Sequence, residues 1–302
     1  MNATLAQPIQ FELPVIQPAE QLLPSSRRPE WLKVRAPGGE SYATIKTMMR
    51  SKSLHTVCEE ARCPNITECW NAGTATFMIL GDTCTRSCGF CAVKTGRPLE
   101  IDPDEPRHVA ESIREMNLRH AVITSVNRDE RADGGSLIWA ETIIRTKELN
   151  PNTTIEVLIP DFKGKMEPLQ RIIDAKPDIL NHNTETVPRL YRRVRPQGKF
   201  VWTLALLKEA KAQNMRTKTG VMLGLGETRE EVLEVMEHLR EVNVNILTLG
   251  QYLQPTKNHL PVDRFVHPSE FDEYRRIGLE MGFDVVESGP LVRSSYHAER
   301  HV

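Results

Sequence analysis

The sequence predicts an α/β fold in which strands and helices alternate around a parallel sheet. The chain has 302 residues, enough for about two ordinary domains or one α/β barrel with additions. Apolar residues make up 39% of it and charged residues 26%, a balance that supports a buried core. Between residues 74 and 288, short β-branched or apolar runs alternate with segments of helical periodicity. Such alternation indicates crossover connections, which join parallel strands.

The elements of this alternation can be placed one after another. Residues 74–82 form a β-branched and apolar run, and the helix expected at 104–116 sets Val109, Ile113 and Met116 on one side. Further strands are expected at 121–126, 155–160, 179–182, 217–225 and 246–253, with a short last one at 284–287. Further helices are expected at 136–149, 166–175, 187–193, 204–213, 230–241 and 268–281. About six strand–helix units fit this pattern.

The N-terminal segment does not have the pattern of an export or transit signal. Residues 1–26 contain no Lys or Arg, and they carry Glu12 and Glu20, whereas targeting peptides are basic and poor in acids. The longest clean apolar run, 75–80, is far shorter than the ~20 residues that span a bilayer. We therefore expect a mobile lead-in over 1–28, a cytoplasmic location and no membrane partner. The net charge of −1 gives no basic field for nucleic acid.

The six cysteines lie in two groups between Cys58 and Cys91, which in a reducing compartment indicates metal or redox chemistry rather than disulfides. The second group, Cys84, Cys88 and Cys91, has the spacing C-x3-C-x2-C and must lie on a loop, where Gly89 would ease the turn. Zinc usually takes a fourth ligand, and none follows. Three thiolates on a [4Fe-4S] cube instead leave one iron free for another ligand, and Phe90 would shield such a cluster from water.

This cysteine loop resembles that of radical S-adenosylmethionine (SAM) enzymes. The first group, Cys58, Cys63 and Cys69, has the spacing C-x4-C-x5-C, which fits neither a zinc ribbon nor a bacterial ferredoxin. Its place shortly before the loop makes it a candidate second cluster. The fourth ligand of that cluster cannot be a cysteine, because all six are used.

Two longer motifs resemble the lipoyl synthase family within the radical SAM enzymes. Residues 55–70 resemble the family's auxiliary-cluster motif, and residues 289–296 contain its R-S-S-Y motif. The resemblance implies an incomplete (β/α)6 TIM-like radical SAM barrel with N- and C-terminal extensions. It also implies two [4Fe-4S] clusters with SAM on the first, and an oxygen ligand to the second from Ser295, with Ser294 as the competitor. An oxygen ligand is harder than thiolate, so the iron that it holds could leave more readily.

The activity implied by the resemblance is sulfur insertion at C6 and C8 of a protein-bound octanoyl-lysine, giving the lipoyl cofactor. The auxiliary cluster would be consumed as the sulfur donor. The partners implied are an octanoylated lipoyl carrier protein or lipoyl domain, an electron donor such as a ferredoxin or flavodoxin, and an iron–sulfur assembly or carrier protein. The chain would then divide into a lead-in (1–28), an extension with the auxiliary-cluster cysteines (29–73), the partial barrel (74–288) and a tail that supplies the serine (289–302).

Polar residues at the expected strand ends are the candidates for binding SAM, because barrel chemistry occurs where strands end. The candidates are Ser125, Asn127, Asn183, Glu185, Lys218 and Gly224. Segment 220–227 resembles the glycine-rich segment that flanks the adenosyl group in radical SAM enzymes. Gly38-Gly39-Glu40 precedes the cysteine loop and cannot be the amine-binding Gly-Gly-Glu, and Asp133-Gly134-Gly135 reads as a turn and cap. We look first at Ser125 and Asn127 for the amine contact.

Two other functions remain open on the sequence. The first is another radical SAM enzyme with an auxiliary cluster, such as a methylthiotransferase that acts on RNA or protein. That enzyme should carry an RNA-binding domain and a basic face, which the length and charge do not favour. The second is a non-catalytic zinc or iron–sulfur protein, whose metal would be indifferent to SAM.

Overall fold

The computed structural model describes residues 28–33, 55–56, 65–71 and 73–302. Its main sheet has eight strands in the order β1-β2-β5-β6-β7-β8-β9-β10. Strand β1 pairs antiparallel with β2, and every other neighbouring pair is parallel. The strands of this sheet are β1 (His55–Thr56), β2 (Thr74–Ile79), β5 (His120–Ser125), β6 (Thr154–Leu158), β7 (Ile179–Asn181), β8 (Arg216–Leu223), β9 (Ile246–Gln251) and β10 (Val285–Gly289).

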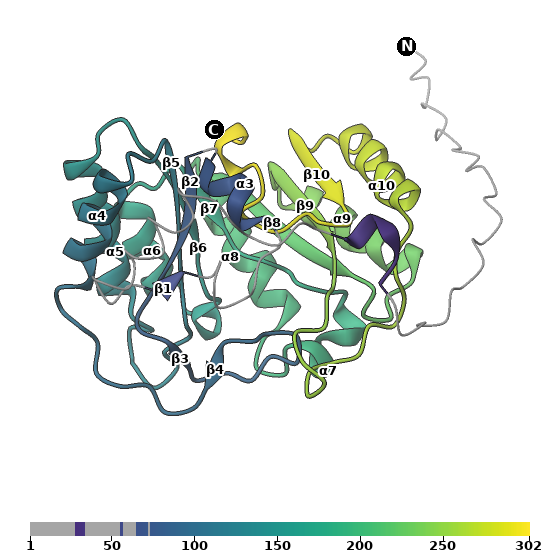
Figure 1. Cartoon of the computed structure of the whole chain (residues 1–302), viewed down its shortest axis with the longest axis horizontal. Helices are drawn as coiled ribbons and strands as arrows, with labels where there is room; N and C mark the ends of the chain where they lie inside the picture. Colours follow the sequence, from purple (N-terminus) through teal and green to yellow (C-terminus); the bar gives the residue numbers. More distant parts are fainter. Residues whose placement is uncertain (1–27, 34–54, 57–64, 72) are drawn as a thin grey trace, which may run out of the picture.

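Helices follow the parallel strands and cover the outside of the sheet (Figure 1). They are α4 (Glu105–Glu115), α5 (Ser136–Leu149), α6 (Met166–Asp174), α7 (Tyr191–Val194), α8 (Phe200–Ala212), α9 (Arg229–Glu241) and α10 (Pro268–Glu280). In the described part of the chain, the outer strands β1 and β10 do not pair with each other, so hydrogen bonds do not close the barrel. The expected incomplete barrel of six strand–helix units is therefore confirmed, and β10 extends it.

The remaining elements are short, and the sequence did not predict them. Strands β3 (Thr83–Cys84) and β4 (Lys94–Thr95) form a separate parallel pair beside the cysteine loop. Helix α3 (Ile66–Asn71) precedes β2. Single 3-10 turns lie at η1 (Glu30–Leu32), η2 (Phe162–Gly164), η3 (Pro188–Leu190) and η4 (Ala298–Arg300). The helix expected at 187–193 is split into η3 and α7, and α8 begins at Phe200 rather than at 204.

The core lies between the sheet and its helices. All six residues of β2 and of β9 are buried, because a parallel sheet in a barrel is covered on both faces. Helix α6 buries Leu169, Ile172 and Ile173, which share one face at helical spacing. No helix within the described residues is long and apolar enough to cross a membrane.

The last residues of the chain run back from β10 to the opposite end of the strands. The carbonyl oxygen of Val292 lies only 2.1 Å from where a Cβ on Gly250 would be, so the chain passes directly against β9. Farther on, Thr74 donates a hydrogen bond to Glu299 (3.0 Å) and Arg216 donates to the His301 carbonyl (2.7 Å). Figure 1 shows this C-terminal segment beside α3, with β3, β4 and α7 at the other end of the sheet.

A buried ion pair fills the interior of the barrel. Lys218 and Glu156 have fully buried side chains, and the Lys218 ammonium lies 2.8 Å from the Glu156 carboxylate. Asn181 donates a second hydrogen bond of 2.7 Å to this carboxylate. Burial opposes ionisation of Glu156, but the charge of Lys218 outweighs it and lowers the pKa of Glu156 to about 2. Glu156 is therefore ionised at neutral pH, and its burial as a charge depends on Lys218.

Substituting Lys218→Met is expected to lower the free energy of unfolding by about 3–5 kcal/mol, because the buried charge of Glu156 would lose its ammonium partner and keep only His120, 3.8 Å away. Urea denaturation of the anaerobic protein would measure this. The double variant Lys218→Met/Glu156→Leu should recover much of the loss, since it removes both charges. Arg276→Met is the control, because Arg276 pairs with Glu280 on the exposed face of α10. Equal stability of Lys218→Met and the wild type would contradict this account.

Candidate active site

The cysteine loop follows β2 and is held in place by backbone contacts. The N–H of Gly96 donates to the Cys84 carbonyl (3.0 Å), which closes the base of the loop at β3 and β4. The Cys84 sulfur accepts the N–H groups of Asn127 (3.3 Å) and Arg86 (3.4 Å). Such N–H···S contacts stabilise thiolate ligands and tune iron–sulfur clusters. The main chain of Asn127, at the end of β5, therefore supports the loop.

A buried charge network ties the loop to the ends of two strands. Arg86 donates to Asp129, after β5, at 2.7 and 3.0 Å, and to Asp161, after β6, at 2.8 and 2.6 Å. Arg195 approaches the same Asp161 at 3.5 Å. Burial opposes ionisation of Asp161, but hydrogen bonds and the charge of Arg86 outweigh it and hold its pKa below the usual value. The network fixes the loop between Cys84 and Cys88.

Close packing fixes the second half of the loop. The N–H of Gly89 donates to Val194 (2.9 Å), and the Gly89 carbonyl accepts from Leu260 (2.9 Å). A Cβ on Gly89 would lie 2.8 Å from the Leu260 side chain. Gly89 lies in the expected turn, which the Cys91 N–H closes by donating to the Cys88 carbonyl (3.1 Å). Its φ is not positive, so it is the close approach of Leu260 that requires a glycine here. Phe90 is partly buried and packs against the core, as a shielding residue would.

Burial favours the neutral form of two thiols in this loop, Cys88 and Cys91. Burial raises the pKa of Cys88 to about 12, against the opposing charge of Arg195, and raises the pKa of Cys91 to about 11. Within the described residues, no three His, Cys, Asp or Glu side chains converge on one metal ion. In a [4Fe-4S] cube each thiolate binds a different iron, so the three thiols need not converge on a single ion. Cluster binding must therefore displace thiol protons at this site.

The strand ends around the loop carry several of the predicted SAM-binding residues. Among the described residues, the buried Ser125 hydroxyl finds no hydrogen-bond partner, as expected of a group that binds a ligand. Glu185 has a left-handed backbone with φ of 68°, and burial raises its pKa despite the opposing charge of Arg195. Asn183 bonds to Glu185 and, through its carbonyl, to Arg195 (2.8 Å). The structure brings these residues to the same end of the barrel as the cysteine loop.

Two other predicted residues, Lys218 and Gly224, make close contacts within the fold. Lys218 pairs with Glu156 inside the barrel, so the structure does not place its ammonium with the residues above. Gly224 has φ of +93°, and a Cβ there would lie 2.2 Å from Gln251. Glu227 accepts the N–H groups of Gly224 and Leu225, so the glycine-rich segment is closed by its own carboxylate. Glycine at 224 is therefore required by backbone geometry and packing.

Three further residues from the strand ends have structural roles. His182 bonds to the Ile159 carbonyl and to Thr203, and burial lowers its pKa to about 4. Gln251 donates to three backbone carbonyls and accepts from Val266. Asp133 accepts the N–H of Leu137 at the start of α5, which confirms the turn and cap expected there.

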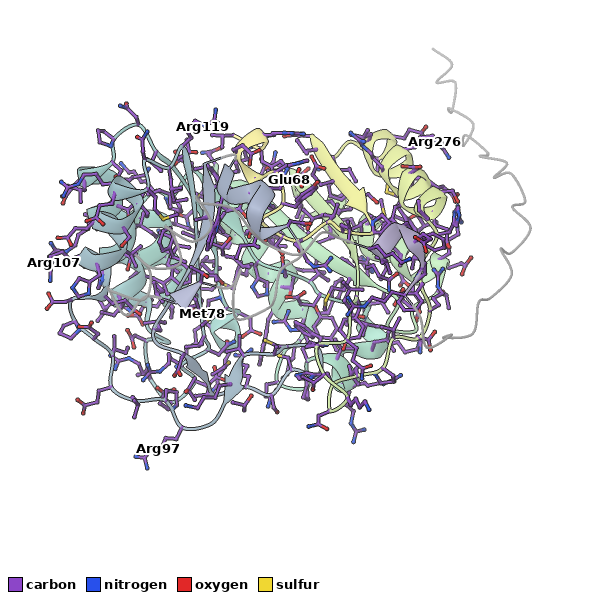
Figure 2. The ribbon with its side chains drawn as sticks, viewed as in Figure 1. Glu68, Met78, Arg97, Arg107, Arg119 and Arg276 are labelled. Atoms are coloured by element: carbon purple, nitrogen blue, oxygen red, sulfur yellow. The ribbon has the colours of Figure 1, made fainter. Side chains whose placement is uncertain are left out.

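The predicted auxiliary-cluster ligands are only partly within the described residues. Cys58 and Cys63 lie outside them, as do Gly38-Gly39-Glu40. Cys69 is on α3, and the C-terminal segment packs against this helix: Asn65 donates to the Leu291 carbonyl (2.7 Å) and Tyr296 donates to Glu68 (3.3 Å). Figure 2 labels Glu68 on α3 beneath the C-terminal segment. The structure therefore brings the R-S-S-Y motif to the helix that carries Cys69.

Comparisons with known proteins decide the family. A model of the radical SAM superfamily matches residues 78–239, and one of the N-terminal domain of lipoyl synthase matches residues 14–63. The lipoyl synthase of Rubrobacter xylanophilus is 60% identical over 90% of this chain and 85% of its own length. The mitochondrial lipoyl synthase of Nematostella vectensis is 55% identical over 92% of this chain and 96% of its own. The chain belongs to the lipoyl synthase family.

Solved structures agree with the fold. Streptococcus suis SuiB bound to S-adenosylmethionine superposes with a TM-score of 0.57 at 11% identity, over 82% of this chain and 61% of SuiB. Coproporphyrinogen III oxidase (HemN) from Escherichia coli, a radical SAM enzyme, gives a TM-score of 0.51 at 12% identity, over 70% of this chain and 55% of that one. At such identities the likeness shows a shared fold.

Membership of the lipoyl synthase family settles the reaction class. The chain is a radical SAM sulfurtransferase that inserts sulfur at C6 and C8 of a protein-bound octanoyl-lysine to give the lipoyl cofactor. Its cofactors are SAM and two [4Fe-4S] clusters, of which the auxiliary cluster is the sulfur donor. This identity is favoured over both alternatives, the methylthiotransferase and the zinc protein.

Sequence reasoning missed several residues of this lipoyl synthase-family site. Arg86 lies inside the C-x3-C spacing and received no predicted role, although it is buried and a buried arginine needs acidic partners. Asp161 directly follows β6, so the rule that chemistry lies at strand ends would have found it. Glu68 precedes Cys69 and contacts the C-terminal segment, a pairing 229 residues apart that no local pattern predicts.

Proposed function

We propose that Cys84, Cys88 and Cys91 hold the cluster that binds SAM, and that Cys58, Cys63, Cys69 and Ser295 hold the auxiliary cluster. SAM would be surrounded by Phe90, Ser125, Asn127, Asn183 and Glu185. Gly224 would shape the backbone of the glycine-rich segment beside SAM. Lys218 supports the barrel from inside. The division of the chain at residues 28, 73 and 288 into lead-in, extension, barrel and tail is part of the same proposal.

The strongest support comes from the C-x3-C-x2-C spacing of the cysteine loop and the family match that covers it. Its three thiols are partly buried, one of them accepts two backbone N–H groups, and the buried Ser125 hydroxyl at the same end of the barrel has no hydrogen-bond partner among the described residues. When bound, the cluster supplies an electron that cleaves SAM. The protein's own part is to orient SAM through the residues at the strand ends and to exclude water behind Phe90 and Leu260.

The choice of Ser295 over Ser294 has its own support. The Ser294 hydroxyl is bonded to Asn183, at 2.6 Å from the amide nitrogen. The Ser295 hydroxyl makes no hydrogen bond to any residue that the structure describes, so it is the one available to a metal. Its position between β10 and the contacts to α3 places it near the helix of Cys69. A hydroxyl ligand to iron must lose its proton on binding, as a thiol does.

The partners follow from the reaction. An octanoylated lipoyl carrier protein or lipoyl domain would present its lysine arm at the open side of the barrel. A ferredoxin or flavodoxin would supply electrons, and an iron–sulfur assembly or carrier protein would rebuild the auxiliary cluster. The near-neutral charge of the chain gives no support for a nucleic-acid partner. A cytoplasmic location remains our prediction, because the free thiols require reducing conditions.

An anaerobic assay tests the function. The reconstituted protein is mixed with an octanoyl-lysine peptide, SAM and a reductant, and the product is analysed by mass. We expect a gain of two sulfur atoms per peptide and one round of product per auxiliary cluster. The control omits SAM and should give no product. Protein that binds about eight irons and cleaves SAM, yet transfers no sulfur, would refute the proposal.

A further inference from the structure

The C-terminal segment is anchored on both sides of Ser295. On the N-terminal side, the Asn183 amide donates to the Ser294 hydroxyl at 2.6 Å, and the hydroxyl lies 3.0 Å from the Asn183 carbonyl oxygen. Gly220 leaves the space for this contact, since a Cβ there would lie 2.9 Å from Asn183. Asn183 is itself held by Arg195 at 2.8 Å. This anchor therefore connects the tail to the barrel wall.

On the C-terminal side, Glu68 of α3 receives two contacts. Its carboxylate accepts from the Tyr296 hydroxyl (3.3 Å) and lies 3.1 Å from His297 Nε2. The two rings stack at 3.8 Å with an angle of 24° between their planes. His297 has a left-handed backbone (φ 51°), which is uncommon for a residue with a Cβ and turns the chain sharply. Glu68 directly precedes Cys69, so this anchor connects the tail to a predicted cluster ligand.

The geometry points to Ser294 and Glu68 as positioning residues that present the Ser295 hydroxyl to the auxiliary cluster. This inference rests on the proposed function, in which Ser295 is a ligand. The contact between Ser294 and Asn183 has a second effect. It occupies the Ser294 hydroxyl, so that of the two serines Ser295 is the one left to bind iron. A short backbone span fixed at both ends also loses little conformational entropy when its central residue becomes a ligand.

The second anchor makes Cys69 and Ser295 move together. Helix α3 has only six residues and meets the tail through side-chain contacts. If those contacts break, the tail stays joined to the barrel by Ser294 while α3 becomes independent of it. Ligands from two unconnected segments hold a cluster less firmly than ligands from one connected unit, because each must be ordered separately.

The test uses full-length protein, anaerobically reconstituted, with the variants Ser294→Ala, Ser294→Thr and Glu68→Gln. We measure the rate of iron loss to a chelator and the Mössbauer signature of the iron with an oxygen ligand. Ser294→Ala and Glu68→Gln should each accelerate loss of auxiliary-cluster iron about twofold to tenfold, the range given by loss of one side-chain hydrogen bond. They should also reduce the oxygen-ligated signature. Reductive cleavage of SAM should stay within about twofold of the wild type.

Two controls keep the result interpretable. Ser294→Thr retains the hydroxyl and should restore the wild-type rate and signature. Glu299→Gln lies on the same segment and alters a contact to Thr74, so it should change neither. Wild-type rates and signatures in both Ser294→Ala and Glu68→Gln would overturn the inference and leave the proposed function standing. A wild type with no oxygen-ligated iron would instead overturn the ligand assignment on which the inference depends.

Discussion

Alanine at any one of Cys84, Cys88 and Cys91 is expected to abolish reductive cleavage of SAM. Each thiol would hold a different iron of one cube, and the loop that carries them offers no substitute ligand. Iron content should fall from about eight to about four per chain, because only the auxiliary cluster would remain. Iron analysis and the yield of 5′-deoxyadenosine from SAM measure the two effects separately. If a variant cleaved SAM at the normal rate, the substituted cysteine would not be a ligand of this cluster.

Substituting Cys69→Ala should give the opposite pattern. The cysteine loop and its anchors at Arg86, Asn127 and Gly89 are untouched by this change, so SAM cleavage should continue. Sulfur insertion should stop, because the sulfur donor cannot assemble. Iron content should again be about four per chain. The two sets of variants thus serve as controls for each other, and sulfur-containing product from Cys69→Ala without an added sulfur source would refute the sacrificial role.

The position of the cysteine loop after the first barrel strand could be predicted from the sequence, because its three cysteines lie close together along the chain. The shape of the loop depends on residues far along the chain, and these were not predictable. Asn127 was expected to contact SAM, which stays a prediction, but the contact of its backbone N–H with the Cys84 sulfur was not foreseen. Gly89 lies in a turn as expected, but it also makes room for Leu260, 171 residues later, which no local pattern predicts. Local patterns carry no information on such approaches.

The same limit applies to secondary structure. Helix α5 runs over Ser136–Leu149 as predicted, because its pattern is long and bounded by a Gly-Gly turn. Helix α8 begins at Phe200, earlier than predicted. The residues Phe-Val-Trp at its start have weak helix propensity, and contacts of Phe200 with Tyr191 and of Trp202 with Gly164, which the sequence does not reveal, hold this first turn. Lys218 follows the sequence rule for a cofactor contact, yet Glu156 on another strand pairs with it. Ion pairs between side chains on different strands decide which polar residues remain available to contact a cofactor.

The charge network around Arg86 gives the second large effect that we expect. Arg86→Gln removes the guanidinium that lies between Asp129 and Asp161. The Asp161 side chain is 1% exposed, and its remaining cationic partner, Arg195, lies 3.5 Å away. Breaking a buried pair by removing one partner costs about 3–5 kcal/mol, so the cluster-free protein should unfold at a clearly lower denaturant concentration. The cysteine loop should also bind iron poorly, because Arg86 lies between Cys84 and Cys88.

The conservative and control variants separate charge from geometry. Arg86→Lys keeps the charge but cannot reproduce bidentate contacts to two carboxylates, so its stability and iron content should lie between those of Arg86→Gln and the wild type. Arg107→Gln is the matched control, because Arg107 pairs with Glu111 on the surface of α4, away from the loop (Figure 2). It should leave stability and iron content essentially unchanged. The account would be contradicted if Arg86→Gln unfolded at the same denaturant concentration as the wild type and its cysteine loop still bound four irons. The charge network would then not be needed for cluster binding. The loop would then owe its shape to Gly89, Asn127 and the β3–β4 pair, and cluster binding should fail in Gly89→Val instead.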